Sequence, residues 1–457
     1  MPKSPNFLLV GVGQCGTQIA DEVHTIAQTL EHGVSDCILV DSESKSIHSK
    51  AGVAAGQDTV LATDSCGRGN NWAHGYAGSV FEQGNALGSQ ACEGIRKSME
   101  SMAQTPCVVL THSWGGGTGS GVGSYILEHM YDVALQHSSD LVSLGICPFQ
   151  SGGSPLQSIN TVLCAATVQS FCSAALVQYN DEVLHAASRL QSAGVAGKHT
   201  QGTPAATKPH MQDLNRIIAE RVACILPCQH VGVEKHVVFP SLVLAESQPC
   251  PLFHPSCVQI SPELLNQHAP RASLLGAALS EVDAGRRFLI DLGPSLAPGS
   301  LALDAESTAL PVLLRCPAST ADDISKAWVS ARSKRFKSLD HSAAAAAACG
   351  SRSDWLFASS SLQAPLRTHS SIDYECQHRG KRISTRMCVD EGWQHSACAV
   401  ILDNGLACKS PLGGSAVLAS SKARIGAYMH LLEPYGVDRE HVLDASAAVN
   451  DWCGSVS

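Results

Sequence analysis

Residues 113–121 read Ser-Trp-Gly-Gly-Gly-Thr-Gly-Ser-Gly and directly follow the apolar stretch Cys107–Thr111. Five glycines within seven residues carry a large entropic cost in a turn that is only structural. A row of exposed backbone N–H groups, with the hydroxyls of Thr118 and Ser120, suits a bound oligophosphate. No lysine follows, so the pattern differs from the P-loop GxxxxGK[ST]. The stretch therefore predicts a phosphate-binding turn between a strand and a helix, and with it an α/β fold.

A second glycine cluster lies near the N-terminus. The segment Gly11-Val12-Gly13-Gln14-Cys15-Gly16 has the spacing GxGxxG and joins an apolar stretch at 7–13 to a helical pattern at 14–30. This motif alone fits a dinucleotide fold with Asp36 or Asp41 as the ribose acid, and it also fits a strand-to-helix turn that needs glycine for packing. A nicotinamide domain has no need of a second such loop. Two phosphate loops on one sheet predict a nucleoside triphosphate.

The wider pattern supports a layered α/β protein. Apolar stretches typical of buried strands also occur at 36–41 and 141–147, and helical patterns lie between them. This alternation predicts a mostly parallel, Rossmann-type sheet with ligand loops at the carboxyl ends of the strands. Further along, the sequence predicts a loop at 191–210, a helix at 211–228, strands at 237–244 and 310–316, a helix near 321–331, and two C-terminal helices within 415–452 that break at 434–436.

Two segments between the glycine clusters could complete a nucleotide site. Asp41-Ser42-Glu43 places two carboxylates after a strand, where they could hold Mg²⁺ through waters, although its spacing alone favours an ordinary acidic loop. Gly69-Asn70-Asn71-Trp72 offers two amides to a phosphate, or forms a turn with Asn in left-handed conformations.

These segments, in this order and spacing, resemble tubulin. The motifs that carry the resemblance are GQCG at Gly13–Gly16, VDxE at Val40–Glu43, GNNWAxGY at Gly69–Tyr76 and GGGTGSG at Gly115–Gly121. The resemblance covers residues 7–230 strongly and returns at 415–452. It implies a GTP-binding domain over 1–210, a central helix over 211–230, an intermediate α/β domain with insertions over 231–410, and a layer of C-terminal helices over 411–457.

The resemblance also implies a set of site residues. Asn180 and Asn215 resemble the two amides by which tubulins hold guanine, since an amide can donate to O6 and accept from the N1 or N2 hydrogens. GTP and Mg²⁺ are the implied cofactors, with Asp41 and Glu43 nearest the metal. The nucleotide-binding residues carried over are Gln14, Cys15, Asp41, Glu43, Asn71, Ser113, Gly116, Gly117, Thr118, Gly119, Asn180 and Asn215. Replacing Thr118 by alanine and Gly119 by valine is expected to abolish GTP binding while leaving the fold largely intact.

Within the family the chain resembles the δ type most and the ζ type next, on Arg68–Tyr76 and Val177–His185. The δ type implies a GTP-binding cytoskeletal protein of the cytoplasm, at centrioles or basal bodies, that supports doublet or triplet microtubules and the assembly of cilia or flagella. Its implied partners are other tubulins or centriolar and basal-body proteins.

The chain departs from the family at several points. The predicted connection at 31–36 is short, Met211 stands where tubulins often stack an aromatic on guanine, and Trp114 replaces a smaller residue. The acidic pattern GxxNxDxxE, which serves hydrolysis in the next subunit, is missing. Glu234 is the remaining candidate for the catalytic acid. We therefore expect weak or absent GTP hydrolysis. Residues 451–457 do not contain the glutamate-rich stretch that tubulins carry after their last helix.

Composition excludes some classes of protein. A formal net charge of -9 over 457 residues argues against a nucleic-acid partner, and no apolar stretch is long enough to insert into a membrane. The N-terminus lacks the pattern of a signal peptide, so the 19 cysteines are expected to be free thiols in a reducing compartment. Cys224, Cys228, Cys250 and Cys257 admit a zinc site, although packed thiols are favoured. Residues 332–350 are expected to form an exposed insertion.

Two other functions remain open at this stage. A GTP-binding regulator of tubulin assembly that does not itself polymerise is favoured by the short 31–36 connection and the missing acidic pattern. A nicotinamide-dependent Rossmann enzyme would need a hydride-transfer site in the second region, and the sequence offers none there.

Overall fold

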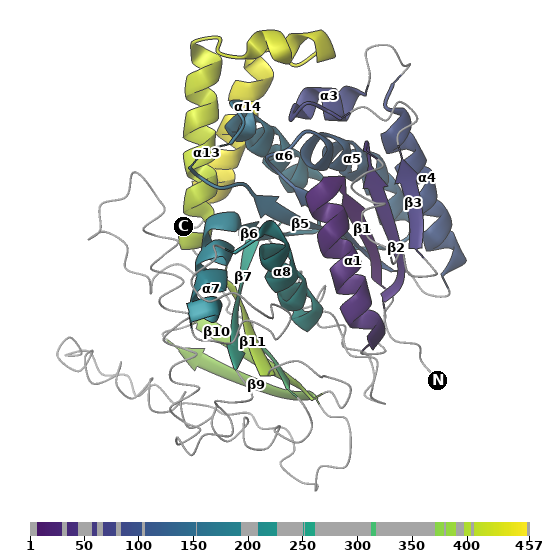
Figure 1. Ribbon diagram of the computed structural model, residues 1–457, viewed down its shortest axis with the longest axis vertical. Helices are drawn as coiled ribbons and strands as arrows, with labels where there is room; N and C mark the ends of the chain where they lie inside the picture. The colour runs from purple at the N-terminus through teal and green to yellow at the C-terminus, as the bar shows by residue number, and fades with distance from the viewer. Residues whose placement is uncertain are drawn as a thin grey trace, which may run out of the picture.

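The computed structural model describes residues 7–29, 34–43, 57–61, 67–78, 84–102, 106–151, 153–192, 209–225, 250, 252–260, 312–316, 371–378, 381–389, 397–403 and 406–454. Figure 1 shows a sheet flanked by helices in the N-terminal half and a helical layer that the C-terminal segment adds.

Six parallel strands form the N-terminal half of the sheet, in the order β3-β2-β1-β4-β5-β6. This is the strand order of a doubly wound Rossmann fold, and the order reverses between β1 and β4. The predicted parallel sheet is therefore confirmed for this half. The strands are β1 (Phe7–Val12), β2 (Val34–Asp41), β3 (Gln57–Leu61), β4 (Cys107–Ser113), β5 (Leu141–Cys147) and β6 (Ala174–Tyr179).

Helices cover both faces of this sheet, because its strands are apolar on both sides. Along β1, Phe7 and Leu9 face one core while Leu8, Val10 and Val12 face the other. The first core contains α1 (Gly13–Thr29), α7 (Asn180–Ser192) and α8 (Met211–Ile225). The second contains α3 (Trp72–Ala77), α4 (Ala86–Ser101), α5 (Gly123–Gln136) and α6 (Gln157–Phe171) (Figure 1).

Five further strands extend the sheet beyond β6 in the order β7-β11-β8-β10-β9. β7 pairs in parallel with β6, and antiparallel and parallel pairs follow, so this part is mixed. The strand predicted at 310–316 is confirmed. The strand expected at 237–244 and the helix expected near 321–331 lie outside the described residues. The strands are β7 (Leu252–Ile260), β8 (Val312–Cys316), β9 (Ser371–His378), β10 (Lys381–Val389) and β11 (Ala397–Asp403).

The two predicted C-terminal helices are present, and both pack against α6 (Figure 1). They are α13 (Leu406–Arg424) and α14 (Arg439–Gly454), and two short 3₁₀ turns at Met429–Leu431 and Glu433–Tyr435 separate them. α13 begins five residues before the boundary expected at 411. Lys422 Nζ donates to the carbonyl of Pro155 at 2.7 Å, which ties this layer to the segment before α6.

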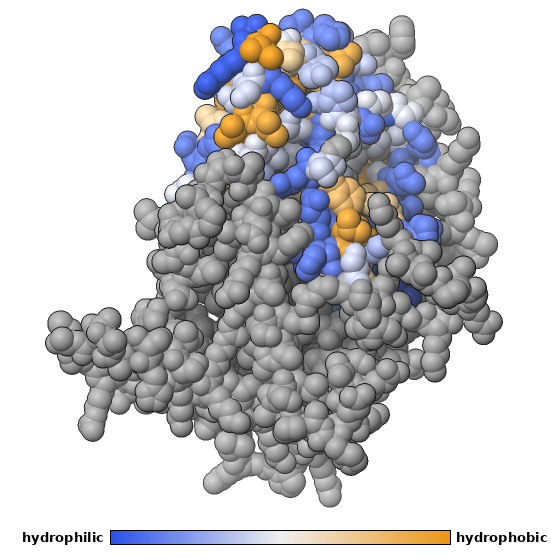
Figure 2. Space-filling model, turned by 60° about the vertical axis from the view of Figure 1, so that its left-hand side comes forward, coloured by the Kyte–Doolittle hydropathy of each residue, from blue (hydrophilic) through white to orange (hydrophobic). Residues whose placement is uncertain are grey.

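The outer face of the C-terminal layer carries apolar side chains. Val417, Leu418 and Ile425 are 59%, 57% and 80% exposed. Figure 2 shows apolar side chains gathered at the top of the molecule, among polar ones. None of the helices within the described residues is both long and apolar enough to cross a membrane.

The cysteines whose side chains the structure describes are all free, as expected. Most of them are buried, and burial raises their pKa values, as it does for Cys107 and Cys172. Cys250 is one of these buried thiols, and its Sγ donates to the carbonyl of Val168 at 3.4 Å. The side chains of Cys224, Cys228 and Cys257 lie outside the described part of the chain, as do residues 332–350.

Candidate nucleotide site

The two glycine loops meet at the point where the strand order reverses. The first follows β1 and opens α1 at Gly13, whose φ of 71° is in the left-handed region that favours glycine. A Cβ on Gly13 would lie 2.8 Å from the amide nitrogen of Gly119, in the second loop after β4. This edge, outside the carboxyl ends of the strands, is where doubly wound sheets bind ligands.

Most glycines of the second loop are required because other atoms of the protein lie close to them. A Cβ on Gly117 would lie 2.7 Å from the carbonyl oxygen of Arg68, and one on Gly119 would lie 2.9 Å from that of Ser113. A Cβ on Gly121 would clash with the carbonyl of Trp72. By contrast, nothing lies within 4 Å of the Cβ position of Gly116, which is partly exposed. Gly116 is therefore the loop position that faces open space.

This packing contradicts the expectation that valine at Gly119 would leave the fold largely intact. A side chain there would strike the protein's own backbone at Ser113 before it met a ligand, because Ser113 nitrogen and oxygen lie 3.0 and 2.9 Å from the Cβ position. Valine at 119 is therefore expected to distort the loop itself. Gly116 is the better position for testing contact with a phosphate.

The end of β2 contacts the second loop through a hydroxyl pair. Ser42 Oγ and Thr118 Oγ1 are 2.8 Å apart, and they bring Asp41 and Glu43 to the same edge of the sheet. Asp41 is buried and its Oδ1 accepts from the backbone of Glu43 at 3.2 Å, whereas the Glu43 side chain is exposed. Ser42 was not predicted as a site residue, although it lies between the two that were.

Asn71 has a structural role in this arrangement. Its Oδ1 accepts from the backbone nitrogens of Ala73 and His74 and so caps α3, while its Nδ2 donates to the carbonyl of Leu431 at 2.6 Å. The amide therefore holds the 67–71 loop against the C-terminal layer. His74 stacks on Tyr435 across the same contact, with ring centroids 4.9 Å apart.

Asn215 and Cys15 lie together at the start of α1. Asn215 Nδ2 donates to Oε1 of Gln18 at 2.7 Å, and the Cys15 thiol lies 4.0 Å from Asn215 Oδ1. This contact joins two segments 200 residues apart, as expected if both belong to one site. Burial raises the pKa of the Cys15 thiol to about 12, so the thiol is neutral near pH 7. Gln14, the first side chain of α1, is exposed.

Asn180 is the first residue of α7 and follows β6 directly. Its side chain is buried and makes no hydrogen bond to any other residue that the structure describes, so its amide is free to meet a ligand. Asp181 accepts from the backbone nitrogen of Gln150 at 2.9 Å, which anchors this turn to the segment after β5. Met211 stands at the position where tubulins often stack an aromatic side chain on guanine, and it is 47% exposed.

Asn160 is a central residue of the site that the sequence did not reveal. This fully buried side chain on α6 donates to the carbonyls of Asn70 at 2.7 Å and Gly115 at 3.0 Å, and accepts from the backbone of Trp72 at 3.0 Å. It joins the 67–71 loop to the second glycine loop. No local motif surrounds it, because its partners lie 45 to 90 residues away in sequence.

The predicted residues that the structure describes lie at the ends of β1, β2, β4 and β6, at the start of α3 and, for Asn215, on α8 beside Cys15. The N-terminus of α1 lies at the end of β1 and carries no acidic residue in its first turn, which favours a bound anion. A π-helical turn at Thr118–Val122 precedes α5, a geometry often found at functional sites. Within the described residues no three His, Cys, Asp or Glu side chains form a metal cluster, and Glu234 lies outside them.

Comparison with known proteins agrees with this geometry. Residues 6–188 match the family model "Tubulin/FtsZ family, GTPase domain". The chain is similar to the tubulin delta chain of Macaca fascicularis, at 26% identity over 225 residues, and to that of Canis lupus familiaris, at 30% identity over 224 residues. Each match covers 41% of this chain and 48% of the relative, so the chain matches about half the length of these curated relatives.

Proposed function

We propose, from the match of residues 6–188 to the Tubulin/FtsZ family GTPase domain, that the chain binds GTP where its two glycine loops meet. The observation that carries the proposal is the close approach of Gly13 to Gly119 at the point where the strand order reverses. Two phosphate-binding turns converge there, and the N-terminus of α1 adds its partial positive charge.

We assign the phosphates to the second loop and the first turn of α1. Gly116 faces open space, Thr118 is partly exposed and held by Ser42, and Gln14 is exposed at the helix start. Ser113, Gly117 and Gly119 shape the loop through their backbones. We assign the guanine base to Asn180, whose amide is free within the described residues, and to Asn215, which Gln18 holds beside Cys15.

The chemistry of the donors fits Mg²⁺. This ion is commonly bound by one or two carboxylates together with phosphate oxygens and waters, so a three-residue cluster is not required. Asp41 and Glu43 supply two carboxylates at the end of β2, beside the Ser42–Thr118 contact. When bound with GTP, the metal would offset the negative charge of the phosphates.

We propose further that hydrolysis is slow or absent. The support is sequence-based: the acidic pattern expected after the central helix is missing, and Glu234 is the remaining acid there. In the cell, the similarity to tubulin delta chains supports a cytoskeletal role at centrioles or basal bodies, in the formation of doublet or triplet microtubules and of cilia or flagella. Other tubulins or basal-body proteins would be the partners.

A regulator of tubulin assembly that binds GTP without polymerising is the second candidate, favoured by the same missing acidic pattern. Tagging the protein and imaging it separates the two. Basal-body localisation supports the first, whereas a diffuse signal with normal axonemes after deletion supports the second.

The nucleotide itself is the direct test. Purified full-length protein should release guanine nucleotide on denaturation, measured by chromatography and mass spectrometry, and should bind GTP more tightly than ATP by calorimetry. Bound NAD, or equal affinity for GTP and ATP, would overturn the proposal.

A further inference from the structure

A buried ion pair joins the two helices that carry the proposed guanine contacts. Arg221 on α8 donates from Nη1 to Glu182 Oε2 at 2.7 Å and from Nη2 to Oε1 at 2.9 Å, so both carboxylate oxygens are engaged. Nη1 also donates to Gln178 Oε1, on β6, at 2.7 Å. Arg221 is 2% exposed and Glu182 is 8% exposed. Two charges so deeply buried require good geometry to be tolerated.

The residues of this ion pair lie close in sequence to the two proposed guanine-binding amides. Glu182 is in the first turn of α7, two residues after Asn180, and Gln178 lies two residues before Asn180 on β6. Arg221 lies on the same helix as Asn215, six residues further along. One guanidinium therefore contacts both sides of the turn that presents Asn180, from the helix that presents Asn215.

The connection along the chain does not fix this relationship by itself. α7 ends at Ser192 and α8 begins at Met211, and a connection of this length could span several tens of ångströms if extended. The two helices pack side by side (Figure 1), so their relative register depends on contacts between them. A planar guanidinium that binds two carboxylate oxygens sets both distance and orientation, unlike a lysine ammonium.

We propose that Arg221, through Glu182 and Gln178, is a positioning residue that sets Asn180 and Asn215 at the spacing needed to select guanine over other bases. This inference rests on the proposed function, because it assumes that the two amides meet the base. The proposal predicts that breaking the ion pair reduces the preference for guanine more than it reduces the overall affinity for nucleoside triphosphates.

The test compares affinities for GTP, ITP and ATP in the full-length protein by calorimetry. ITP lacks the 2-amino group of guanine, and ATP reverses the hydrogen-bonding pattern of the base. The main variant is Glu182→Gln with Arg221→Met, which removes both charges together and avoids leaving one charge buried alone. Arg221→Lys is the second variant, since it keeps the charge and loses the two-pronged geometry.

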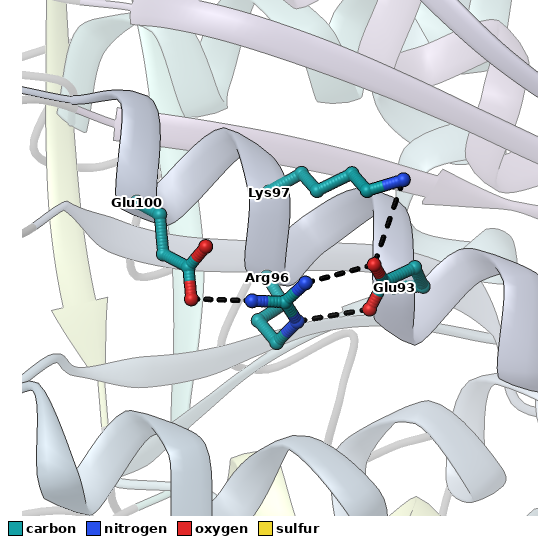
Figure 3. A network of polar contacts seen from close by, with 4 residues as sticks. All are labelled: Glu93, Arg96, Lys97 and Glu100. Carbon is teal, nitrogen blue, oxygen red and sulfur yellow. Dashed lines mark hydrogen bonds and ion pairs between the residues drawn. The ribbon is translucent and has the colours of Figure 1, made fainter.

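The chain offers a control pair in which an arginine also binds both oxygens of a glutamate. On α4, Arg96 donates from Nε and Nη2 to the two oxygens of Glu93, both at 2.8 Å (Figure 3). These side chains are 38% and 47% exposed and lie on a helix that covers the other face of the sheet. Glu93→Gln with Arg96→Met therefore removes a similar pair at an exposed position.

We expect the ATP-to-GTP and ITP-to-GTP ratios of dissociation constants to fall by about tenfold in the main variant, which is the loss of about one hydrogen bond to the base. Arg221→Lys should lower the ratios by a smaller factor, and the α4 control should leave them unchanged. If the pair had a merely structural role, breaking it would raise the dissociation constants for all three nucleotides by a common factor, and the ratios would stay constant.

The outcomes separate this inference from the function on which it rests. Wild-type protein that does not prefer GTP would overturn both. Wild-type preference for GTP with unchanged ratios in the main variant would overturn the inference alone. If circular dichroism shows that the main variant is unfolded, Arg221→Lys decides: wild-type ratios in that variant overturn the inference, and reduced ratios support it.

Discussion

The imidazole of His112 donates a hydrogen bond of 3.0 Å from Nδ1 to the carbonyl oxygen of Gly119. The other ring nitrogen identifies the tautomer, because Nε2 lies 3.3 Å from Nε1 of Trp114, which can only donate. Nε2 also accepts from the hydroxyl of Ser143 at 2.7 Å. A neutral ring with its proton on Nδ1 satisfies all three contacts, and its hydrogen bond holds the Gly119 carbonyl of the second glycine loop in place.

His112 should make stability depend on pH. Burial lowers its pKa to about 4, whereas an unfolded histidine has a pKa near 6.5. Between these values the unfolded chain binds more protons, so the free energy of unfolding falls as the pH falls from about 6.5 to 4, by about 3 kcal/mol.

Urea unfolding of wild type and His112→Gln at pH 7, 5.5 and 4.5 measures this effect. The carboxylates titrate in both proteins, so the difference between them isolates His112. The variant should be less stable at pH 7 and should lose less stability on acidification. Parallel pH profiles would show that His112 does not titrate in this way.

Two glycines of the same loop should respond differently to a side chain. Gly116→Val points into open space, so it should leave the free energy of unfolding within about 0.5 kcal/mol of wild type, as for a tolerated surface change, and should weaken GTP binding. Gly119→Val should lower stability by several kcal/mol, because its side chain meets the backbone of Ser113. Calorimetry and urea unfolding measure the two effects. Unimpaired GTP binding by folded Gly116→Val would argue against the phosphate assignment.

Asn160 and Asn180 form a second matched pair. Both are buried, but among the described residues only the side chain of Asn160 has hydrogen-bond partners, namely two backbone carbonyls and one backbone nitrogen. Asn160→Ala should cost about 2–4 kcal/mol of stability, because it leaves several buried polar groups without partners. Asn180→Ala should keep most of the stability and lose affinity for GTP. Equal losses of stability in the two variants would contradict a ligand-binding role for Asn180.

The reactivity of the Cys15 thiol should depend on whether nucleotide is bound. The pKa values of Cys15 and Cys92 are both raised to about 12 by burial, and both side chains are partly exposed. Both thiols should therefore react slowly with iodoacetamide at pH 8. GTP should slow the reaction of Cys15 further and leave Cys92, on α4, unchanged, as measured by mass spectrometry. Equal protection of both would indicate general tightening of the fold.

Local sequence patterns were sufficient for much of the nucleotide-binding half. β5 was predicted to the residue at 141–147, α8 was predicted to begin at Met211, and α1 was predicted to begin one residue after its observed start. The break predicted at 434–436 lies within the segment that separates α13 from α14. These elements have strong periodicity or clear glycine and proline boundaries, so neighbouring residues determine them. The alternation of strands and helices also predicted ligand loops at the carboxyl ends of the strands, where the two glycine loops meet in the structure.

The sequence by itself determined that two glycine loops follow two strands of a parallel sheet, since composition and spacing are local properties. Only the tertiary structure decided what those glycines contact. It showed that Gly117, Gly119 and Gly121 make room for neighbouring backbone and that Asn71 caps a helix. It also showed that Asn160 and His112 bind the backbone of the second glycine loop and that Arg221 joins α8 to α7. The physical reason is that a hydrogen bond or a close contact depends on distance in space, and these partners lie up to 360 residues apart along the chain.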